Sequence, residues 1–592
     1  MAGVSIVSSD VRALTRTKAV PQRAVDVFLR YLKAEGVRVV FGIPGGLLFP
    51  FFEAIEEDDE FELVVAKHEE GAAFMADGYA RLTRRLAVCA GTSGPGATNL
   101  LTGVACAFAD GVPMLVVTGQ AATHALGRGA AQETPREDID IVAMFQPVTK
   151  YSAMVTAAAD LPRHLRRALR QALSGRPGPV HLNLPVDLWE QALSEDWFEP
   201  RTYRPETASF DRVPLQQATE ALMRARFPLL LAGSGVAISG AEEHLRTLAE
   251  LLQARVVTTP RAKGVFPEDH PLSLGVMGFA GHEEATATAF GDDIDVLFTV
   301  GASLNETTTM NWDPRLRPSQ ALIQLDIDPE RIARNYPVDV ALVADAQTAL
   351  VELTYHVHRA IRQGEQPASE WHSQPAPKRG HERHMFPDLR QADSSPLTPQ
   401  RWRVELEQVL PSDAIVFSDI GGHMLFNVHD LTIREGQRFV LNLGFGSMGH
   451  GTVAPIGAAL ACPDRPIVAI VGDACFTMNG MELLTAVEYQ VPVLWIVENN
   501  NMHGITWHGS RALSRRGKAL SSVRYRERLD VAALCRAMGL SAWVVDAPET
   551  LGDCVRRALA QRLPAVIEVR VDGSIAPPLG GRVRSLAGFI QR

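Results

Sequence analysis

The chain has 592 residues, of which 46% are apolar and 21% charged, and its formal net charge is −10. This composition is typical of a globular protein; it excludes a disordered or fibrous chain and argues against a general nucleic-acid binder. Because a chain of this length exceeds a single hydrophobic core, we expect about three domains of roughly 100–200 residues each.

The cysteines and the first residues of the chain favour a cytoplasmic protein. None of the six cysteines forms a CxxC pair and most stand in apolar runs, so we interpret them as reduced core residues. Residues 1–20 contain no long apolar stretch, so no signal peptide is expected. Every apolar run of about 18 residues is broken by charge or by Gly and Pro, so we predict neither a membrane span nor a membrane partner.

Short apolar runs of strand type alternate with amphipathic helical stretches along the whole chain, and two polar stretches, 194–214 and 362–399, interrupt this alternation. Alternation of this kind predicts an α/β fold in which parallel sheets carry helices on both faces, as in doubly wound domains. The expected division is a flexible arm over 1–20, an N-terminal domain over 21–193, a central domain over 212–356, a linker over 357–395 and a C-terminal domain over 396–580.

In the N-terminal third, Glu69 falls in the first turn of an Ala-rich helix that follows the strand-like run 61–66. An acidic residue there is, taken alone, most often a surface partner of the helix dipole. Taken alone, the Gly-Pro-Gly turn within 91–120 is a common connection between helices and strands.

In the C-terminal third, the apolar run 466–472 ends at Asp473, and the next run, 493–498, leads into Asn499 and Asn500. Right-handed crossovers make the two strands parallel, so their carboxyl ends share one edge of the sheet and Asp473 and Asn500 are expected to meet. A carboxylate and an amide oxygen suit Mg²⁺ or Ca²⁺, and a bound diphosphate would complete the shell. The plain alternative is that Asp473 only caps the following helix.

Other chemistries have weaker signals. Gly444, Gly446 and Gly449 match the dinucleotide fingerprint and would make Asp473 a ribose-binding acid, but this motif alone is weak and stands far from the start of the chain. No GxSxG elbow is present. The pair His381/His384 lies in the polar linker, where we expect solvated side chains and not a zinc site.

The spacing of Gly472-Asp473-Ala474 and Asn499-Asn500 resembles the signature of thiamine diphosphate enzymes, a GDG motif followed at similar spacing by NN. By this resemblance Asp473, Asn500 and the backbone carbonyl of Met502 hold the metal, and Ala474 replaces the usual glycine. The stretch VVAKHEEGAAFMADGYAR closely matches RHEQGAAHAADGYAR of acetolactate synthases. Further similar segments occur at 42–46, 91–120, 131–133 and 148–151.

The resemblance covers nearly the whole chain and implies a pyrimidine-binding, a central and a diphosphate-binding domain. It also implies an active site between subunits, with Glu69 of one facing Asp473 of another, and therefore a homodimer or a dimer of dimers. Glu69 aligns with the catalytic glutamate, which hydrogen-bonds the cofactor pyrimidine and favours the tautomer that removes the C2 proton. Gln132 aligns with an active-site glutamine.

The same resemblance assigns the cofactor contacts, among which Met448 forces the bent shape of thiamine diphosphate. The implied contacts are Pro44, Gly45, Gly94, Asn99, Gly422, His423, Gly446, Met448, Gly472, Asp473, Ala474, Cys475, Asn500, Met502, His503 and Gly504.

The chain departs from biosynthetic acetolactate synthases in its substrate pocket. Thr307 stands where the family has an arginine that supports FAD and faces the second 2-oxo acid, so FAD binding is left open. Ala131 replaces a phenylalanine, and Trp507 and His508 are additions beyond the metal asparagine. These three residues are expected to line a pocket reshaped for a larger or non-acidic acceptor; the alternative is that His503 and His508 are loop residues and Trp507 is packing.

The leading hypothesis is a carboligase dependent on thiamine diphosphate and Mg²⁺, a transferase or lyase. It would decarboxylate a 2-oxo acid, pyruvate first among the candidates, and pass the acyl unit to a carbonyl acceptor. The alternatives are a 2-oxo acid decarboxylase without ligation, an FAD-linked oxidase and a dinucleotide-dependent dehydrogenase. A cofactor-free binding protein is disfavoured by the retained Glu69, Asp473 and Asn500.

Overall fold

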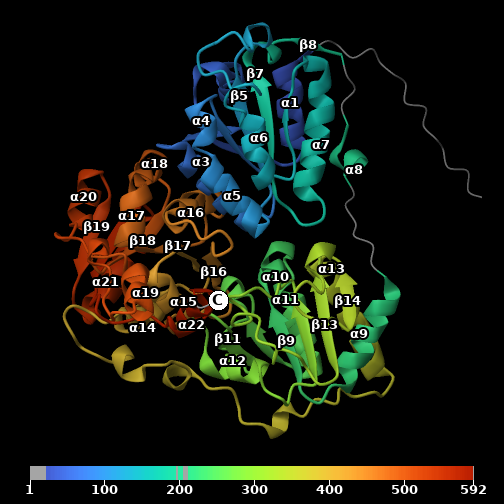
Figure 1. The fold of residues 1–592 in the computed structure, drawn as a ribbon, viewed down its shortest axis with the longest axis vertical. Coiled ribbons are helices and arrows are strands. Elements are labelled where there is room, and N and C mark those ends of the chain that lie inside the picture. Colours follow the sequence, from blue (N-terminus) through green and yellow to red (C-terminus); the bar gives the residue numbers. More distant parts are fainter. Residues whose placement is uncertain (1–21, 195–197, 205–210, 591–592) are drawn as a thin grey trace, which may run out of the picture.

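The computed structural model describes residues 22–194, 198–204 and 211–590, so the expected arm over 1–20 lies outside the described residues. Three lobes follow one another along the chain, coloured blue to cyan, green, and orange to red in Figure 1. Each lobe contains a six-stranded parallel sheet, which confirms the prediction of three α/β domains. In the part of the chain that the structure describes, no helix combines the length and apolar character that a membrane crossing requires.

The N-terminal domain has the strand order β3-β2-β4-β5-β7-β6. Its strands are β2 (Val39–Ile43), β3 (Glu62–Val65), β4 (Ala87–Gly91), β5 (Met114–Gln120), β6 (Ser152–Met154) and β7 (Pro179–Pro185). Its helices are α1 (Ala24–Ala34), α2 (Phe49–Glu56), α3 (Glu69–Thr83), α4 (Pro95–Thr98), α5 (Leu101–Asp110), α6 (Ile141–Phe145) and α7 (Leu161–Leu173). Successive side chains of a strand point to opposite faces. Accordingly, Cys89 of β4 packs with α3 and α5, while its neighbours Val88 and Ala90 pack with α1, α2 and α7.

A short antiparallel pair, β1 (Gln22–Arg23) and β8 (Ala192–Leu193), joins the two ends of this domain, and α8 (Pro200–Tyr203) follows. The central domain has the order β11-β10-β9-β12-β13-β14. Its strands are β9 (Pro228–Ala232), β10 (Arg255–Thr258), β11 (Ser273–Val276), β12 (Val296–Val300), β13 (Ala321–Asp326) and β14 (Val340–Val343). Its helices are α9 (Arg212–Arg224), α10 (Ser234–Ser239), α11 (Glu242–Leu252), α12 (Glu283–Ala289) and α13 (Ala346–Arg362), so α13 continues through the first residues of the expected linker.

The C-terminal domain has the order β16-β15-β17-β18-β20-β19. Its strands are β15 (Ile415–Ser418), β16 (Arg438–Leu441), β17 (Ile467–Gly472), β18 (Val493–Asn499), β19 (Ser541–Val545) and β20 (Ala565–Arg570). Its helices are α14 (Pro399–Val409), α15 (Gly422–Asp430), α16 (His450–Ala461), α17 (Asp473–Asn479), α18 (Leu483–Glu488), α19 (Gly504–Leu513), α20 (Val531–Ala537), α21 (Pro548–Gln561) and α22 (Gly580–Ile590). Strands β17 and β18 are parallel neighbours in which Gly472 pairs with Glu498, so their carboxyl ends coincide as predicted.

Helices α3 and α16 join the N-terminal and C-terminal domains into one apolar core. Their backbones approach so closely that only glycine fits at two positions. A Cβ atom on Gly78 would lie 2.0 Å from the carbonyl oxygen of Ala454, and one on Gly457 would lie 1.9 Å from that of Met75. This contact fixes the N-terminal domain against the C-terminal sheet.

The segment between α13 and α14, drawn in gold in Figure 1, runs along the central and C-terminal domains. Trp371 within it is buried and donates from Nε1 to the carbonyl oxygen of Pro228 (2.8 Å). The expectation that His384 is solvated is wrong: the side chain is buried, and its Nδ1 donates to the carbonyl oxygen of His429 (2.9 Å). The side chain of His381 lies outside what the structure describes.

Candidate active site

The loop that follows β18 folds back onto the first residue of α17. The N–H of Asn501 donates to Oδ2 of Asp473 (2.7 Å), and the N–H of Ala474 donates to its Oδ1 (2.8 Å). Oδ1 of Asn500 accepts from the N–H of Met502 (3.1 Å). Asp473 is buried, and burial raises the pKa of its carboxyl to about 7. A bound cation would favour the carboxylate, and the oxygen donors gathered at this sheet edge suit Mg²⁺.

A second set of groups beside this loop suits a diphosphate. The N-termini of α15 and α19 face each other, because a Cβ atom on Gly422 would lie 3.5 Å from the nitrogen of Ile505. Helix N-termini present free N–H groups and partial positive charge to anions. The His423 ring packs against Gly472, where a Cβ atom would lie 2.8 Å from Nδ1. Nε2 of His423 is buried without a hydrogen-bond partner among the described residues, as expected for an atom that awaits a ligand.

The loop that precedes α16 is held by the buried Asp419. Its Oδ1 accepts from the N–H of Gly449 (2.9 Å) and its Oδ2 from the hydroxyl of Thr452 (2.8 Å). Gly446 takes a φ of 78°, and Met448 stands half-buried between these two glycines. The neighbouring Cys475 donates from Sγ to the carbonyl oxygen of Ile420 (3.1 Å), so it links α17 to the loop before α15.

Glu69 is the first residue of α3. Its Oε2 accepts from Nδ2 of Asn99 (2.9 Å), and a Cβ atom on Gly96 would lie 3.4 Å from its Oε1. The structure thus brings together Glu69, the implied catalytic residue, and Asn99, one of the implied cofactor contacts.

The remaining N-terminal positions lie in loops at the same sheet edge. Pro44 is exposed, and Gly45 approaches Thr92 so closely that a Cβ atom would lie 2.5 Å from that side chain. Gly94 takes a φ of 66°, and a Cβ atom there would lie 3.5 Å from Cβ of Gln132. Ala131 and Gln132 are exposed, and the carbonyl oxygen of Gln132 accepts from the hydroxyl of Ser93 (2.6 Å).

The start of α3 is held by a C-terminal residue that sequence reasoning missed. Oε1 of the buried Glu482 accepts from the N–H groups of Lys67 (3.0 Å) and His68 (2.7 Å). Nδ2 of Asn479 donates to Oε2 of Glu70 (3.1 Å). These contacts join residues more than 400 positions apart, so no local sequence pattern predicts them.

The aromatic and histidine side chains at the start of α19 make different contacts. Nε2 of His503 lies 3.1 Å from the hydroxyl of Tyr525, and Trp507 is half-buried with its ring edge-on to His508. The His508 ring is buried and pairs with the carbonyl oxygen of Gly573 (3.0 Å). His508 thus lies in α19 and not in a loop, and its inward contact is that of a packing residue, which neither expectation for His508 had given.

A buried ion pair behind His423 was also missed. Arg403 is fully buried and pairs with Glu498 (2.8 Å). It donates to the carbonyl oxygen of His423 (3.0 Å) and to Oδ1 of Asn427 (2.8 Å). The pair therefore ties the start of α15 to the end of β18, one residue before the two asparagines.

Two positions elsewhere bear on cofactors. The Thr307 hydroxyl donates to Oδ1 of Asn305 (2.9 Å), and a threonine offers no cation to an acceptor carboxylate.

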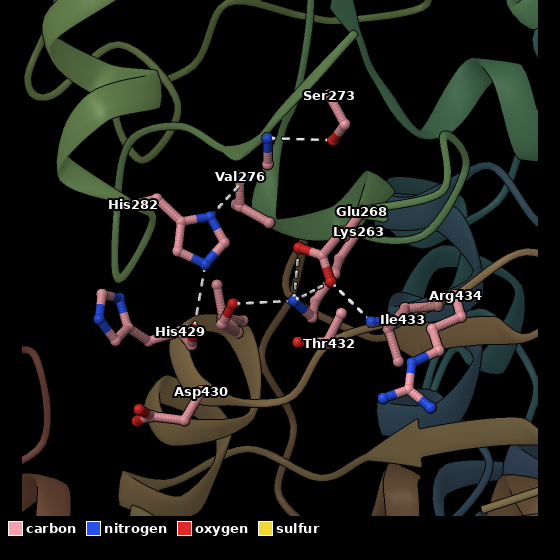
Figure 2. Close-up of polar contacts among 12 residues, drawn as sticks. Lys263, Glu268, Ser273, Val276, His282, His429, Asp430, Thr432, Ile433 and Arg434 are labelled. Atoms are coloured by element: carbon pink, nitrogen blue, oxygen red, sulfur yellow. Dashed lines mark hydrogen bonds and ion pairs between the residues drawn. The ribbon is translucent and has the colours of Figure 1, made fainter. Parts of the chain in front are cut away.

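Potential ligand atoms of His384, His429 and Asp430 lie within 4.8 Å of one another. Three of the ring nitrogens already have backbone partners: Nδ1 of His384 donates to a carbonyl oxygen, Nε2 of His429 accepts from the N–H of Met385 (2.9 Å), and Nδ1 of His429 pairs with the carbonyl oxygen of Gly281 (3.2 Å). Figure 2 shows His282 bonded to the same His429 backbone, which is the arrangement of an interdomain contact and not of a metal site.

Three family profiles match the chain in order: the thiamine pyrophosphate enzyme N-terminal TPP binding domain over 22–144, the central domain over 215–353 and the C-terminal TPP binding domain over 419–569. The chain belongs to the thiamine pyrophosphate enzyme family. The glycine motif at 444–449 thus lies inside a TPP-binding domain of this family, which removes the support for a dinucleotide-dependent dehydrogenase.

Within this family the chain is similar to acetolactate synthases. It is 32% identical to a probable acetolactate synthase large subunit of Methanocaldococcus jannaschii, covering 95% of each chain. It is 32% identical to the acetolactate synthase isozyme 3 large subunit of Escherichia coli, covering 93% of this chain and 95% of that one. It is 33% identical to an acetolactate synthase large subunit of Parasynechococcus marenigrum over 91% of this chain and 86% of that one. The chain is therefore a thiamine diphosphate-dependent enzyme of the acetolactate-synthase type, and carboligation is favoured over simple decarboxylation.

Proposed function

We propose that this enzyme decarboxylates a 2-oxo acid, with pyruvate as the first candidate, and transfers the acyl unit to a carbonyl acceptor. The observation that carries the proposal is the convergence of Asp473, the Asn500 loop and the unpartnered nitrogen of His423 at one sheet edge. Thiamine diphosphate, when bound, supplies the carbanion chemistry, while the protein orients it and adjusts its protonation.

The C-terminal residues would hold the charged end of the cofactor. Asp473, Asn500 and the carbonyl oxygen of Met502 would bind Mg²⁺, and the orphaned His423 nitrogen with the facing helix N-termini would bind the diphosphate. The Arg403–Glu498 pair holds the start of α15, which carries His423, against the end of β18, which leads into Asn500.

The N-terminal residues would handle the proton. Glu69 would hold a proton at N1′ of the aminopyrimidine, and Asn99 orients the carboxylate by its hydrogen bond (2.9 Å). Gln132 and Ala131, exposed in their loop, would face the substrate together with Trp507. FAD is not part of the proposal, because Thr307 supplies no charge to support it.

We further propose a cytoplasmic homodimer or homotetramer in which Glu69 of one subunit faces Asp473 of its partner. The support for this arrangement is the resemblance to acetolactate synthases, in which the two corresponding residues face each other across subunits. The proposed partners are small molecules, a 2-oxo acid and a carbonyl acceptor.

The test mixes purified protein, thiamine diphosphate and Mg²⁺ with a panel of 2-oxo acids, with and without aldehydes and ketones. Released CO₂ and new products are measured, the latter by mass spectrometry. A hydroxy-ketone that forms together with CO₂ supports the carboligase and names its substrates. Release of CO₂ with free aldehyde in every mixture would favour the decarboxylase, and no turnover of any acid would overturn the proposal.

A further inference from the structure

Positive charge is concentrated in one stretch that begins in the last turn of α19. Residues 511–528, here the basic segment, carry a net charge of +6 in a chain whose total is −10, so all other residues together carry −16. Its cations are Arg511, Arg515, Arg516, Lys518, Arg524, Arg526 and Arg528. A patch of one sign on a surface of the other sign produces a strong local potential.

The charges of the basic segment are not neutralised by the fold. All seven cations are exposed, and within the described ranges none of them forms an ion pair. Among the residues that the structure describes, Arg511 is the one cation of the segment that lies over an aromatic ring, with its guanidinium 5.8 Å from the ring centre of Trp507. Exposed, unpaired cations keep their full field toward the solvent, where a mobile anion can respond to it.

The basic segment is anchored on the loop that carries the proposed metal ligands. The N–H of His503 donates to the carbonyl oxygen of Val523 (2.9 Å), and the N–H of Tyr525 donates to that of Asn501 (3.1 Å). Met502 and Arg524 form an antiparallel bridge. The Tyr525 hydroxyl also meets Nε2 of His503 (3.1 Å). The positive patch therefore borders the metal loop directly.

We propose that the basic segment collects the anionic 2-oxo acid at the entrance of the active site and lowers its KM. The inference rests on the proposed function, which makes a small carboxylate the substrate. A compact anion at the patch feels mainly the +6 of the segment, whereas an extended polyanion would also meet the negative remainder of the surface. The same distribution repels anions elsewhere, so the entrance is the favoured place for them.

The test removes four of the charges in one variant, Arg515→Gln, Arg516→Gln, Arg526→Gln and Arg528→Gln. A matched control removes four exposed arginines of α7, α9 and α13, by Arg170→Gln, Arg224→Gln, Arg359→Gln and Arg362→Gln. Figure 1 shows these helices across the molecule from α19 and α20. Both variants keep the same net charge, so only the position of the lost cations differs.

The kcat and KM for the 2-oxo acid, and the KM for a neutral aldehyde, are measured at low and high salt. Four charges at roughly 10 Å from the anion should raise its KM about 5–10-fold at 10 mM ionic strength and less than about 2-fold at 0.5 M. We expect kcat, the aldehyde KM and the thermal unfolding midpoint to stay unchanged, and the control to shift the acid KM by less than about 2-fold.

A wild-type KM that does not respond to salt, or an equal rise in both variants, overturns the collecting role and leaves the proposed function standing. Failure of the wild-type protein to turn over any 2-oxo acid overturns the proposed function and this inference together. An unchanged KM in a variant that no longer binds a polyanion resin, when the wild type does, would assign the segment to a polyanionic partner instead.

Discussion

The acid stability of the boundary between the central and C-terminal domains is open to a quantitative test. His282 accepts at Nδ1 from the N–H of Val276 (3.0 Å) and pairs through Nε2 with the carbonyl oxygen of His429 (3.1 Å), as Figure 2 shows. His384 donates to the same carbonyl oxygen (2.9 Å). Burial lowers the pKa of His384 to about 2 and holds that of His282 well below its usual range. Both rings are therefore neutral at this boundary.

The substitution His384→Asn isolates one of these rings, because the asparagine amide can donate to the same carbonyl and does not titrate. In the unfolded chain a histidine has a pKa of about 6.5, so between about pH 2 and 6.5 the unfolded state binds a proton that the folded state does not. Stability due to His384 is thus present above pH 6.5 and falls as the pH falls. At pH 5 the loss is about 2 kcal/mol, from ~1.5 pH units at ~1.36 kcal/mol each.

Thermal unfolding midpoints at pH 7.5 and pH 5.0 measure this loss. For a cooperative unit of about 150–250 residues, 2 kcal/mol corresponds to roughly 4–8 °C, so the wild type should fall by that much more than His384→Asn. Groups whose pKa is raised by burial, such as Asp473, act in the opposite direction but are common to both proteins and cancel. A control, His358→Asn, removes an exposed ring and should behave as the wild type. An equal acid shift in His384→Asn and the wild type would refute the reasoning.

Three further predictions test the site itself. Glu69→Gln should leave folding and cofactor binding intact and lower kcat by about 10²–10⁴-fold, measured by product formation; near-normal turnover would remove Glu69 from its role. Asp473→Ala should weaken Mg²⁺-dependent binding of thiamine diphosphate more than about 100-fold in calorimetric titration, beyond the loss typical of an outer-shell partner; unchanged affinity would place the metal elsewhere. Arg403→Met should destabilise the enzyme by about 3–5 kcal/mol in denaturant unfolding, because Glu498 is left buried without its partner. The double variant with Glu498→Leu should recover most of that loss, and no recovery would contradict the pairing.

Sequence rules predict the parallel sheets, and they predict that Asp473 lies close to the loop that carries Asn500. Each depends on a rule that acts within one crossover: alternation fixes the faces of a strand, and handedness fixes which ends coincide. The partner predicted for Asp473 is Asn500, and the contact that the structure shows is with the N–H of the next residue, Asn501.

Contacts between distant segments could not be predicted in this way. Glu482 acts on a helix more than 400 residues earlier, and Arg403 acts through a carbonyl on another helix. The burial of His384 could not be predicted in this way either. The polar, Pro-rich composition of 362–399 indicates a segment that is exposed on average, and it does not determine whether one side chain is buried. Burial there is decided by the end of α15, which supplies the carbonyl oxygen of His429.

The glycine contact between α3 and α16 limits how such enzymes can be recombined. Since the first and last domains share one continuous core, neither can be exchanged for that of a relative without its counterpart. The central domain keeps two apolar clusters of its own, one on each face of its sheet. A chimera that inherits both outer domains from one parent and the middle one from another should therefore keep the shared frame, whereas a single cut between the outer domains would divide it.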